Sequence, residues 1–243
     1  TLSESMLPEE NFKFVNTYLS KMGPIVRENN GYIDKFIGDA IMALFENSPD
    51  DAVRTSVKML DALREYNKVR IREGNDPIRI GIGVNTGMMM LGTLGESDRM
   101  EGSVISDAVN IAARLEGLTK LYKTPLLISG ETLLKIDDSI FETRLIDKVA
   151  VKGKVKPIMV HEVLNGETPD LREIKISMLP NFKKCFELYQ NQKFENALEL
   201  FRKYLKKVPE DHVGQLYVDR CKKILSSGWD SENWEGINYM DNK

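Results

Sequence analysis

The stretch GYIDKFIGDAIMALF occupies residues 31–45 and changes the hydrophobic period of the chain. Its two short apolar runs, at 32–37 and 40–45, consist largely of residues that favour strands. Gly38 and Asp39 separate the runs, and a Gly/Asp pair between strand-like segments is typical of a tight turn. The stretch therefore predicts a β-hairpin with Asp39 at or beside its tip.

Helix and strand signals alternate on both sides of this hairpin. Apolar residues at spacings of three and four predict helices over 8–28, from 48 toward 74, and over 106–121. Alternation predicts a strand over 78–84, a glycine-punctuated hairpin over 87–95, and strands at 126–128, 143–151 and 157–164. This order predicts an α+β fold with helices on one face of a mostly antiparallel sheet.

The strand signals stop in the polar stretch around 165–170, which we interpret as a domain boundary. The predicted divisions are a catalytic-type domain over 1–165, a linker over 166–177, a helical region over 178–226 and a tail over 227–243. The helical region resembles the second half of one tetratricopeptide unit. A single unit cannot bury both faces of its helices, so it must pack on the preceding domain, a second chain or a partner. The tail contains both tryptophans and is predicted to dock.

Composition limits the classes of function. The 243 residues have a net charge of -3, which argues against a surface that grips nucleic acid or acidic lipid. Two cysteines and two histidines are too few for a thiolate or imidazole metal site, so a metal site must use carboxylates, which suit Mg²⁺. No apolar run has the length of a membrane span and no signal segment is present. We expect a cytoplasmic segment without membrane contact, compatible with a sensor or membrane domain upstream.

Three segments carry candidate site residues, and each also has an ordinary structural explanation. Lys35 and Asp39 lie at the end of the predicted hairpin, where an Asp beside Gly is common in any turn. Asn110 and Arg114 are four apart and share one face of a predicted helix, where Arg114 pairs with an anion or with a structural carboxylate. Residues 152–156 form a basic hairpin tip, which is typically solvated.

Other familiar sites are absent from the sequence. The glycines between 81 and 95 form neither a Walker A loop nor a dinucleotide fingerprint, and we expect them to let two sheet surfaces or two chains approach closely. His161 and His212 do not complete a nucleophilic triad, and we interpret both as structural.

Four blocks in this order, at 31–45, 79–87, 104–116 and 151–154, resemble the catalytic domain of class III nucleotidyl cyclases, the adenylate and guanylate cyclases. The resemblance covers about residues 1–164 and implies a ferredoxin-like α/β sandwich of the cyclase type, followed by a small all-α region. It implies conversion of ATP to 3′,5′-cyclic AMP and pyrophosphate.

The resemblance also implies a role for each candidate residue. Asp39 matches one of two aspartates that hold two Mg²⁺ (or Mn²⁺) ions in each site. Lys35 and Ser103 match the two residues that read the base, and a Lys at position 35 favours adenine. The remaining residues match those that contact the rest of the nucleotide. Asn110 matches the residue that orients the ribose, Arg114 the residue that stabilises charge on the α-phosphate, and Lys152 the residue that contacts the outer phosphates.

In the family, the metal aspartates and the Asn, Arg and Lys residues come from opposite sides of a dimer interface. One chain here carries both sets, so the resemblance implies a head-to-tail homodimer with ATP bound at two equivalent sites. The other metal aspartate is expected just before Thr1, so we expect the chain as given to be inactive. Alternatives are a guanylate cyclase and an inactive cyclase-like interaction module. A diguanylate cyclase would need a Gly-Gly-acid-acid-Phe hairpin, which this sequence does not contain.

Overall fold

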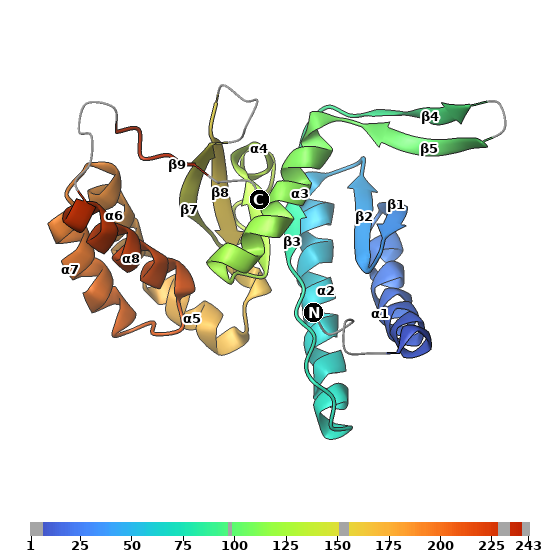
Figure 1. The fold of residues 1–243 in the computed structure, drawn as a ribbon, viewed down its shortest axis with the longest axis horizontal. Coiled ribbons are helices and arrows are strands. Elements are labelled where there is room, and N and C mark those ends of the chain that lie inside the picture. The colour runs from blue at the N-terminus through green and yellow to red at the C-terminus, as the bar shows by residue number, and fades with distance from the viewer. Residues whose placement is uncertain (1–6, 97–98, 151–155, 228–233, 240–243) are drawn as a thin grey trace. The chain divides into compact units, whose positions relative to one another are not determined.

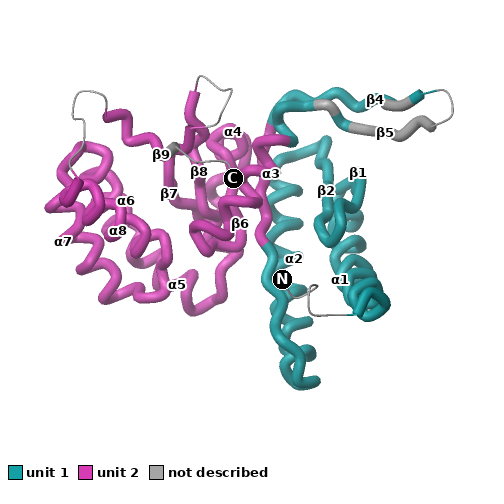
Figure 2. The backbone as a smooth tube through the Cα atoms, viewed as in Figure 1, with its two compact units in different colours: residues 1–80, 87–109 teal, residues 81–86, 110–243 magenta. Residues whose placement is uncertain are grey.

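A computed structural model describes residues 7–96, 99–150, 156–227 and 234–239 (Figure 1). The chain divides into two compact units (Figure 2). Unit 1 comprises residues 1–80 and 87–109, and unit 2 comprises residues 81–86 and 110–243. The helix α3, Asp107–Tyr122, begins in unit 1 and continues into unit 2.

Unit 1 contains the two helices and the first hairpin that the sequence predicts. Helix α1 spans Pro8–Glu28 and helix α2 spans Pro49–Arg72, while β1, Gly31–Ile37, pairs antiparallel with β2, Ala40–Phe45. The start of α2 is capped by Ser48, whose side chain accepts from the Asp50 amide. Apolar side chains of α1, β2 and α2 are buried, among them Met22, Val26, Leu44, Val53 and Leu60.

A second hairpin in unit 1 differs from its prediction. Strands β4, Met90–Glu96, and β5, Arg99–Ile105, pair antiparallel from Met90 opposite Ile105 to Glu96 opposite Arg99. The glycine-punctuated pattern predicts the whole hairpin over 87–95, whereas its two strands extend from 90 to 105. Gly92 instead pairs within β4, so glycine here marks a strand interior.

Unit 2 is built on a five-stranded sheet in the order β3-β6-β8-β7-β9. These strands span Ile82–Val84, Leu126–Ser129, Ile158–Val163, Thr143–Ala150 and Asn238–Tyr239 respectively. The outer pairings β3–β6 and β7–β9 are parallel, and the inner ones are antiparallel. With the two hairpins of unit 1, four of the six strand pairings in the described part of the chain are antiparallel, and the α+β prediction is confirmed.

The first strand of this sheet is shorter than predicted. The alternation over 78–84 predicted a strand of seven residues, whereas β3 spans only Ile82–Val84. Asn67 of α2 accounts for the difference at its start: its side chain donates to the Ile78 carbonyl and accepts from the Ile78 amide. These bonds replace the ladder that a strand would supply at Ile78.

The C-terminal region of unit 2 is helical. The single-turn helix α4, Gly130–Leu133, lies earlier, between β6 and β7. After β8 comes a short 3₁₀ turn at Leu164–Gly166, and four helices follow it in the described part of the chain. They are α5 (Pro169–Ser177), α6 (Leu179–Gln190), α7 (Phe194–Leu205) and α8 (His212–Ser227). Helix α5 occupies most of the range predicted as a linker. In Figure 1, α6, α7 and α8 lie together beside β7.

Aromatic side chains fill the space between these helices and the sheet. Rings of α6, α7 and α8 pack edge to face, at centroid distances from 4.8 to 6.0 Å, and one pair stacks. The tail contributes Trp234, which lies 5.4 Å from Tyr189 and 5.0 Å from Phe194 between ring centroids. The helical region thus packs on the preceding sheet, and Trp234 docks on the helices. Trp229 lies outside the described residues.

A buried ionic network joins the sheet to the helical region. The Arg144 guanidinium donates to both oxygens of Asp211, at 2.5 and 2.9 Å, and to Glu162 at 2.6 Å. Lys175 Nζ donates to Glu162 at 2.7 Å and to Glu167 at 2.5 Å. Since each member is almost fully buried, each charge depends on its partners for solvation.

Candidate active site

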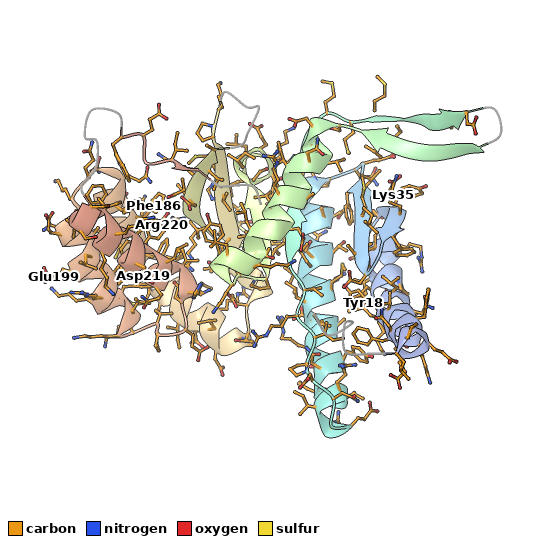
Figure 3. All side chains as sticks on the ribbon, viewed as in Figure 1. Tyr18, Lys35, Phe186, Glu199, Asp219 and Arg220 are labelled. Carbon is orange, nitrogen blue, oxygen red and sulfur yellow. The ribbon has the colours of Figure 1, made fainter. Side chains whose placement is uncertain are left out.

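The β1–β2 hairpin of unit 1 positions Lys35 and Asp39. Gly38 adopts φ +63°, which a glycine tolerates without strain, and this turn leaves Asp39 exposed beside it. Asp39 acts electrostatically on Tyr18 of α1: burial, and secondly the Asp39 carboxylate, raise the pKa of the Tyr18 phenol to about 12. Figure 3 labels Tyr18 on α1 and Lys35 on β1.

A bulge in β1 sets the direction of Lys35. The pairing register of β1 with β2 shifts between Ile33 and Lys35, so Asp34 is the extra residue. Asp34 is buried, with 5% of its side chain exposed, and its Oδ2 lies 3.3 Å from Lys35 Nζ. Lys35 keeps 39% of its side chain exposed. The ammonium group is therefore held at the hairpin surface by a carboxylate beneath it.

Helix α3 positions Asn110 and Arg114 in unit 2. Both side chains are exposed, whereas Ile111 and Leu115 on another face of the helix are buried. The four-residue spacing predicted that the two side chains share one face of a helix. Both residues lie within α3, so this prediction is confirmed. The anion that the sequence analysis expected near Arg114 must therefore come from outside the packed core.

Two glycines fix α3 against the sheet. A Cβ on Gly83 of β3 would clash with the backbone of Ala112 and Glu116, and a Cβ on Gly81 would clash with the Thr119 side chain. Gly81 and Gly83 do allow a close approach, but it is between a strand and a helix and not between two sheet surfaces or two chains as predicted. Because β3 touches the α3 backbone directly, it sets the position of the turn that carries Arg114.

The start of α3 has its own anchor within unit 1. Ser106 Oγ accepts from the Ala108 amide at 2.9 Å and donates to the Met88 carbonyl at 2.6 Å. The first bond caps the helix as the sequence predicted. The second ties the cap to the segment that leads into β4.

The last two predicted site residues are Ser103 and Lys152. Ser103 lies in β5, where it pairs with Gly92 of β4. Lys152 lies outside the described residues, in the segment between β7 and β8. The structure thus places Lys35, Asp39 and Ser103 in unit 1, and Asn110 and Arg114 in unit 2.

Asp39 has the chemistry of a ligand for a hard cation. It is an exposed carboxylate at a turn, and Mg²⁺ commonly binds through one or two carboxylates together with substrate phosphates. No cluster of three His, Cys, Asp or Glu side chains suited to a metal occurs among the residues that the structure describes. Asp39 therefore fits a metal that is completed by phosphate oxygens and further ligands. His161 lies in β8 of unit 2, where burial lowers its pKa to about 4.

Sequence reasoning missed two buried carboxylates that contact the elements carrying the predicted site residues. Asp34 adjoins a motif residue, but no sequence pattern announces a bulge. Asp147, fully buried in β7, has partners on α3, α8 and β9, the last of which is 91 residues away in the chain. The one sign of Asp147 in the sequence is an Asp within an apolar strand pattern. Such a pattern indicates a buried carboxylate, and a buried carboxylate requires partners.

This chain belongs to the family described as the adenylate and guanylate cyclase catalytic domain, which matches residues 1–165. It is 37% identical over 226 residues to the "Adenylate cyclase, terminal-differentiation specific" of Dictyostelium discoideum, covering 90% of this chain and 11% of that protein. It is 43% identical over 170 residues to the "Adenylate cyclase" of Anabaena cylindrica, covering 67% and 34%. The chain thus spans about a tenth and a third of these relatives.

Solved cyclase structures share the fold. The guanylyl cyclase Cya2 is 34% identical with a TM-score of 0.58, over 69% of this chain and 86% of that one. The adenylyl cyclase CyaB from P. aeruginosa is 30% identical with a TM-score of 0.60, over 67% and 86%. The predicted family and the cyclase-type fold are therefore confirmed.

Proposed function

We propose that this chain is the catalytic part of an adenylate cyclase that converts ATP to 3′,5′-cyclic AMP and pyrophosphate. The observation that carries the proposal is the exposed pair Asn110 and Arg114, one turn apart on α3, in a chain of the cyclase family. The names of the Dictyostelium and Anabaena relatives support the activity.

The reaction requires positioning and charge neutralisation more than covalent chemistry. The ribose 3′-oxygen forms a bond to the α-phosphorus while the bond from that phosphorus to the pyrophosphate oxygen breaks, and the hydroxyl proton leaves. Asn110 would orient the ribose, and the Arg114 guanidinium would stabilise charge on the α-phosphate. Lys152 would neutralise the departing pyrophosphate.

Class III cyclases are metal-dependent, and we propose Mg²⁺ or Mn²⁺, two ions in each site. Asp39 would hold them together with a second aspartate. When bound, such ions activate a hydroxyl and neutralise phosphate charge. A variant such as Asp39→Asn should abolish metal-dependent turnover while leaving the fold intact, since Asp39 is exposed.

We propose adenine as the base, read by Lys35 with Ser103. A specific observation favours the guanylate alternative, since a solved guanylyl cyclase is 34% identical to this chain. The test is turnover of ATP and of GTP by the full-length protein with Mg²⁺ and with Mn²⁺. Cyclic AMP as the main product supports the proposal. Cyclic GMP as the main product overturns the assignment of adenine as the base. No product from either nucleotide supports the inactive interaction module.

We further propose a head-to-tail homodimer with two equivalent sites; class III cyclases are dimeric. Unit 1 exposes apolar side chains that a second copy would cover. Met88, which precedes β4, and Met90 and Leu91, which begin it, are 95%, 73% and 55% exposed. Such a run is unusual on a monomer's surface.

Complementation between two inactive chains tests this arrangement. Asp39→Asn removes the metal ligand of one surface and Arg114→Ala removes the phosphate contact of the other. In a head-to-tail dimer, a mixed pair contains one intact site, so mixing should restore about a quarter of wild-type activity by random pairing. Mixing without recovery, while mixed dimers form, would show that each site is built from a single chain.

We also propose that this region works on the cytoplasmic side of any membrane to which the full protein is attached. None of the helices that the structure describes combines the length and apolar character needed to cross a bilayer. The tetratricopeptide-like character of 178–226 stays a prediction.

A further inference from the structure

Asp147 of β7 is a fully buried carboxylate at which four elements meet. Its Oδ2 accepts from the Tyr122 hydroxyl of α3 at 2.5 Å and lies 2.8 Å from Arg220 Nη1 of α8. Its Oδ1 accepts from Asn238 Nδ2 of β9 at 2.6 Å, and from the Lys148 amide at 2.7 Å. A buried charge is stable only with such partners, so the four elements depend on one another here.

The contact with Tyr122 gives this cluster a connection to the candidate site. Tyr122 is fully buried at the end of α3, the helix that carries Asn110 and Arg114. Eight residues separate Tyr122 from Arg114, which is roughly 12 Å of helix at 1.5 Å per residue. A single uninterrupted helix transmits a shift or tilt over that length.

Helix α8 and the tail hold the other side of Asp147. Arg220, labelled in Figure 3, also lies over the Tyr217 ring at 4.9 Å, and Tyr217 donates to the Ile146 carbonyl at 2.7 Å. Strand β9 adds to the edge of β7, with Asn238 opposite Val149. Both attachments lie on the strand that carries Asp147.

The tail is anchored upstream of Asn238 as well. Trp234 Nε1 donates to the Gln190 carbonyl at 3.2 Å, and Gln190 Nε2 donates to the Gly236 carbonyl at 3.1 Å. Gly236 has φ +66°, and a Cβ there would clash with the Gln190 side chain. The path of the tail is therefore specified residue by residue, which an incidental contact does not require.

We propose that Asp147 is a positioning residue for α3, and that the C-terminal region, through Arg220 and Asn238, sets the placement of Asn110 and Arg114. This inference rests on the proposed cyclase function for its kinetic readout. It assigns the C-terminal helices a role in the reaction of the same chain. Removing a partner of Asp147 should misplace α3 without touching the nucleotide.

The variants are Tyr122→Phe, which removes one hydroxyl, and Arg220→Met, which removes a guanidinium but keeps an apolar stem. The matched control is Lys222→Met, because Lys222 lies on α8 with half of its side chain exposed and pairs only with the exposed Asp219 among the contacts described. In the full-length protein, below the temperature at which any variant unfolds, both test variants should lower kcat by about tenfold or more and change the KM for ATP by less than about twofold.

A double-mutant cycle separates positioning from general destabilisation. If Arg220 acts on α3 through Asp147, Arg220→Met should have little further effect on kcat in a Tyr122→Phe background, because both variants break the same contact. Independent, multiplicative losses would overturn the proposal. So would unchanged kcat in both test variants with only a lower melting temperature.

Amide hydrogen exchange tests the same coupling without catalysis. Arg220→Met should speed exchange in residues 110–122 and leave the β1–β2 hairpin unchanged, whereas Lys222→Met should change neither. Unchanged exchange in α3 would overturn the inference. A protein that lacks cyclase activity but shows the faster exchange would instead refute the proposed function and retain the coupling.

Discussion

Lys35 Nζ lies 3.3 Å from Oδ2 of Asp34, its neighbour in the same strand. Adjacent residues of a regular strand point to opposite faces, so this pair forms only because β1 contains a bulge. The bulge gives a surface ammonium group a buried counter-charge. Lys35 therefore has a restricted orientation before any nucleotide arrives.

The first prediction concerns this pair. Asp34→Asn keeps the shape but removes the charge, so Lys35 should lose its fixed orientation. Since Lys35 is partly exposed, we expect a loss of about 1 kcal/mol in binding, or about fivefold in the KM for ATP. The preference for ATP over GTP should fall with it. Steady-state kinetics with both nucleotides measures the change.

Asp61→Asn is the control for Asp34→Asn, because Asp61 pairs with Arg64 on the exposed face of α2. It should leave both KM values unchanged. If Asp34→Asn lowers only the melting temperature, Asp34 has no role in reading the base.

The second prediction concerns the contact between β3 and α3. Gly83→Ala places a methyl group against the backbone of Ala112 and Glu116, which cannot move aside as a side chain can. We expect a loss of about 2 kcal/mol in the free energy of unfolding, and a larger proportional loss of cyclase activity because α3 shifts. Urea unfolding and cyclase assays measure the two effects.

Gly92→Ala provides the comparison for Gly83→Ala, since a Cβ at Gly92 meets nothing within 4 Å. Its stability and activity should match those of the wild type. Equal effects of the two substitutions would mean that the tight contact at Gly83 has no special importance.

The third prediction concerns pH. Burial, and secondly nearby Glu162, raise the pKa of Glu167 from 4.5 to about 7, against the opposing effect of Lys175. The folded state therefore holds a proton that the unfolded state has lost, and this contribution to stability falls as the pH rises from 4.5 through 7. His161 acts oppositely: its pKa is lowered from 6.5 to about 4 by burial, so its contribution rises with pH over that range.

In the wild type, the opposite pH dependences that Glu167 and His161 give to the free energy of unfolding should largely cancel between pH 5 and 6.5. Above pH 6.5 the free energy of unfolding should fall slightly. Glu167→Gln removes the contribution of Glu167 and leaves that of His161. As the pH rises, the free energy of unfolding of this variant should therefore increase relative to that of the wild type by roughly 2–3 kcal/mol. Urea unfolding at several pH values measures this. Glu199→Gln, at an exposed position on α7, should keep the wild-type profile, and parallel profiles for all three proteins would contradict the prediction.

The fourth prediction concerns dimer formation. Met90→Lys places a charge in the exposed apolar run of β4 and should weaken the proposed homodimer by about tenfold, or about 1.4 kcal/mol. Cyclase activity should fall at low protein concentration and recover at high concentration. Leu134→Lys substitutes an equally exposed residue of unit 2 and should change neither quantity. Sedimentation at a series of concentrations gives the dimer affinity.

Local signals in the sequence predicted much of the fold. Helix α1 has the predicted limits, because Pro8 and the spacing of apolar residues act within the helix itself. The β4–β5 hairpin was placed too early, since glycines mark turns and strand interiors alike. Strand β9 had no signal, because two residues pair with β7 only after the helices have brought them there.

The candidate site was predictable to the extent that it is local. Asn110 and Arg114 share a helix face through their spacing alone, and the β1–β2 turn exposes Asp39. Their supports were not predictable in the same way. Asp147 acquires its partners from α3, α8 and β9, and such long-range contacts leave no periodic pattern in a sequence.

The bond between Arg144 and Asp211 spans 67 residues and limits how the C-terminal helices can be replaced. The family match ends at residue 165, yet the charges buried on the sheet are neutralised by residues beyond it. Exchanging the segment after 165 would take Asp211 from Arg144 and Lys175 from Glu162, and the buried pair would keep only each other. Such an exchange should therefore destabilise the sheet, because each of the two buried charges loses a charged partner.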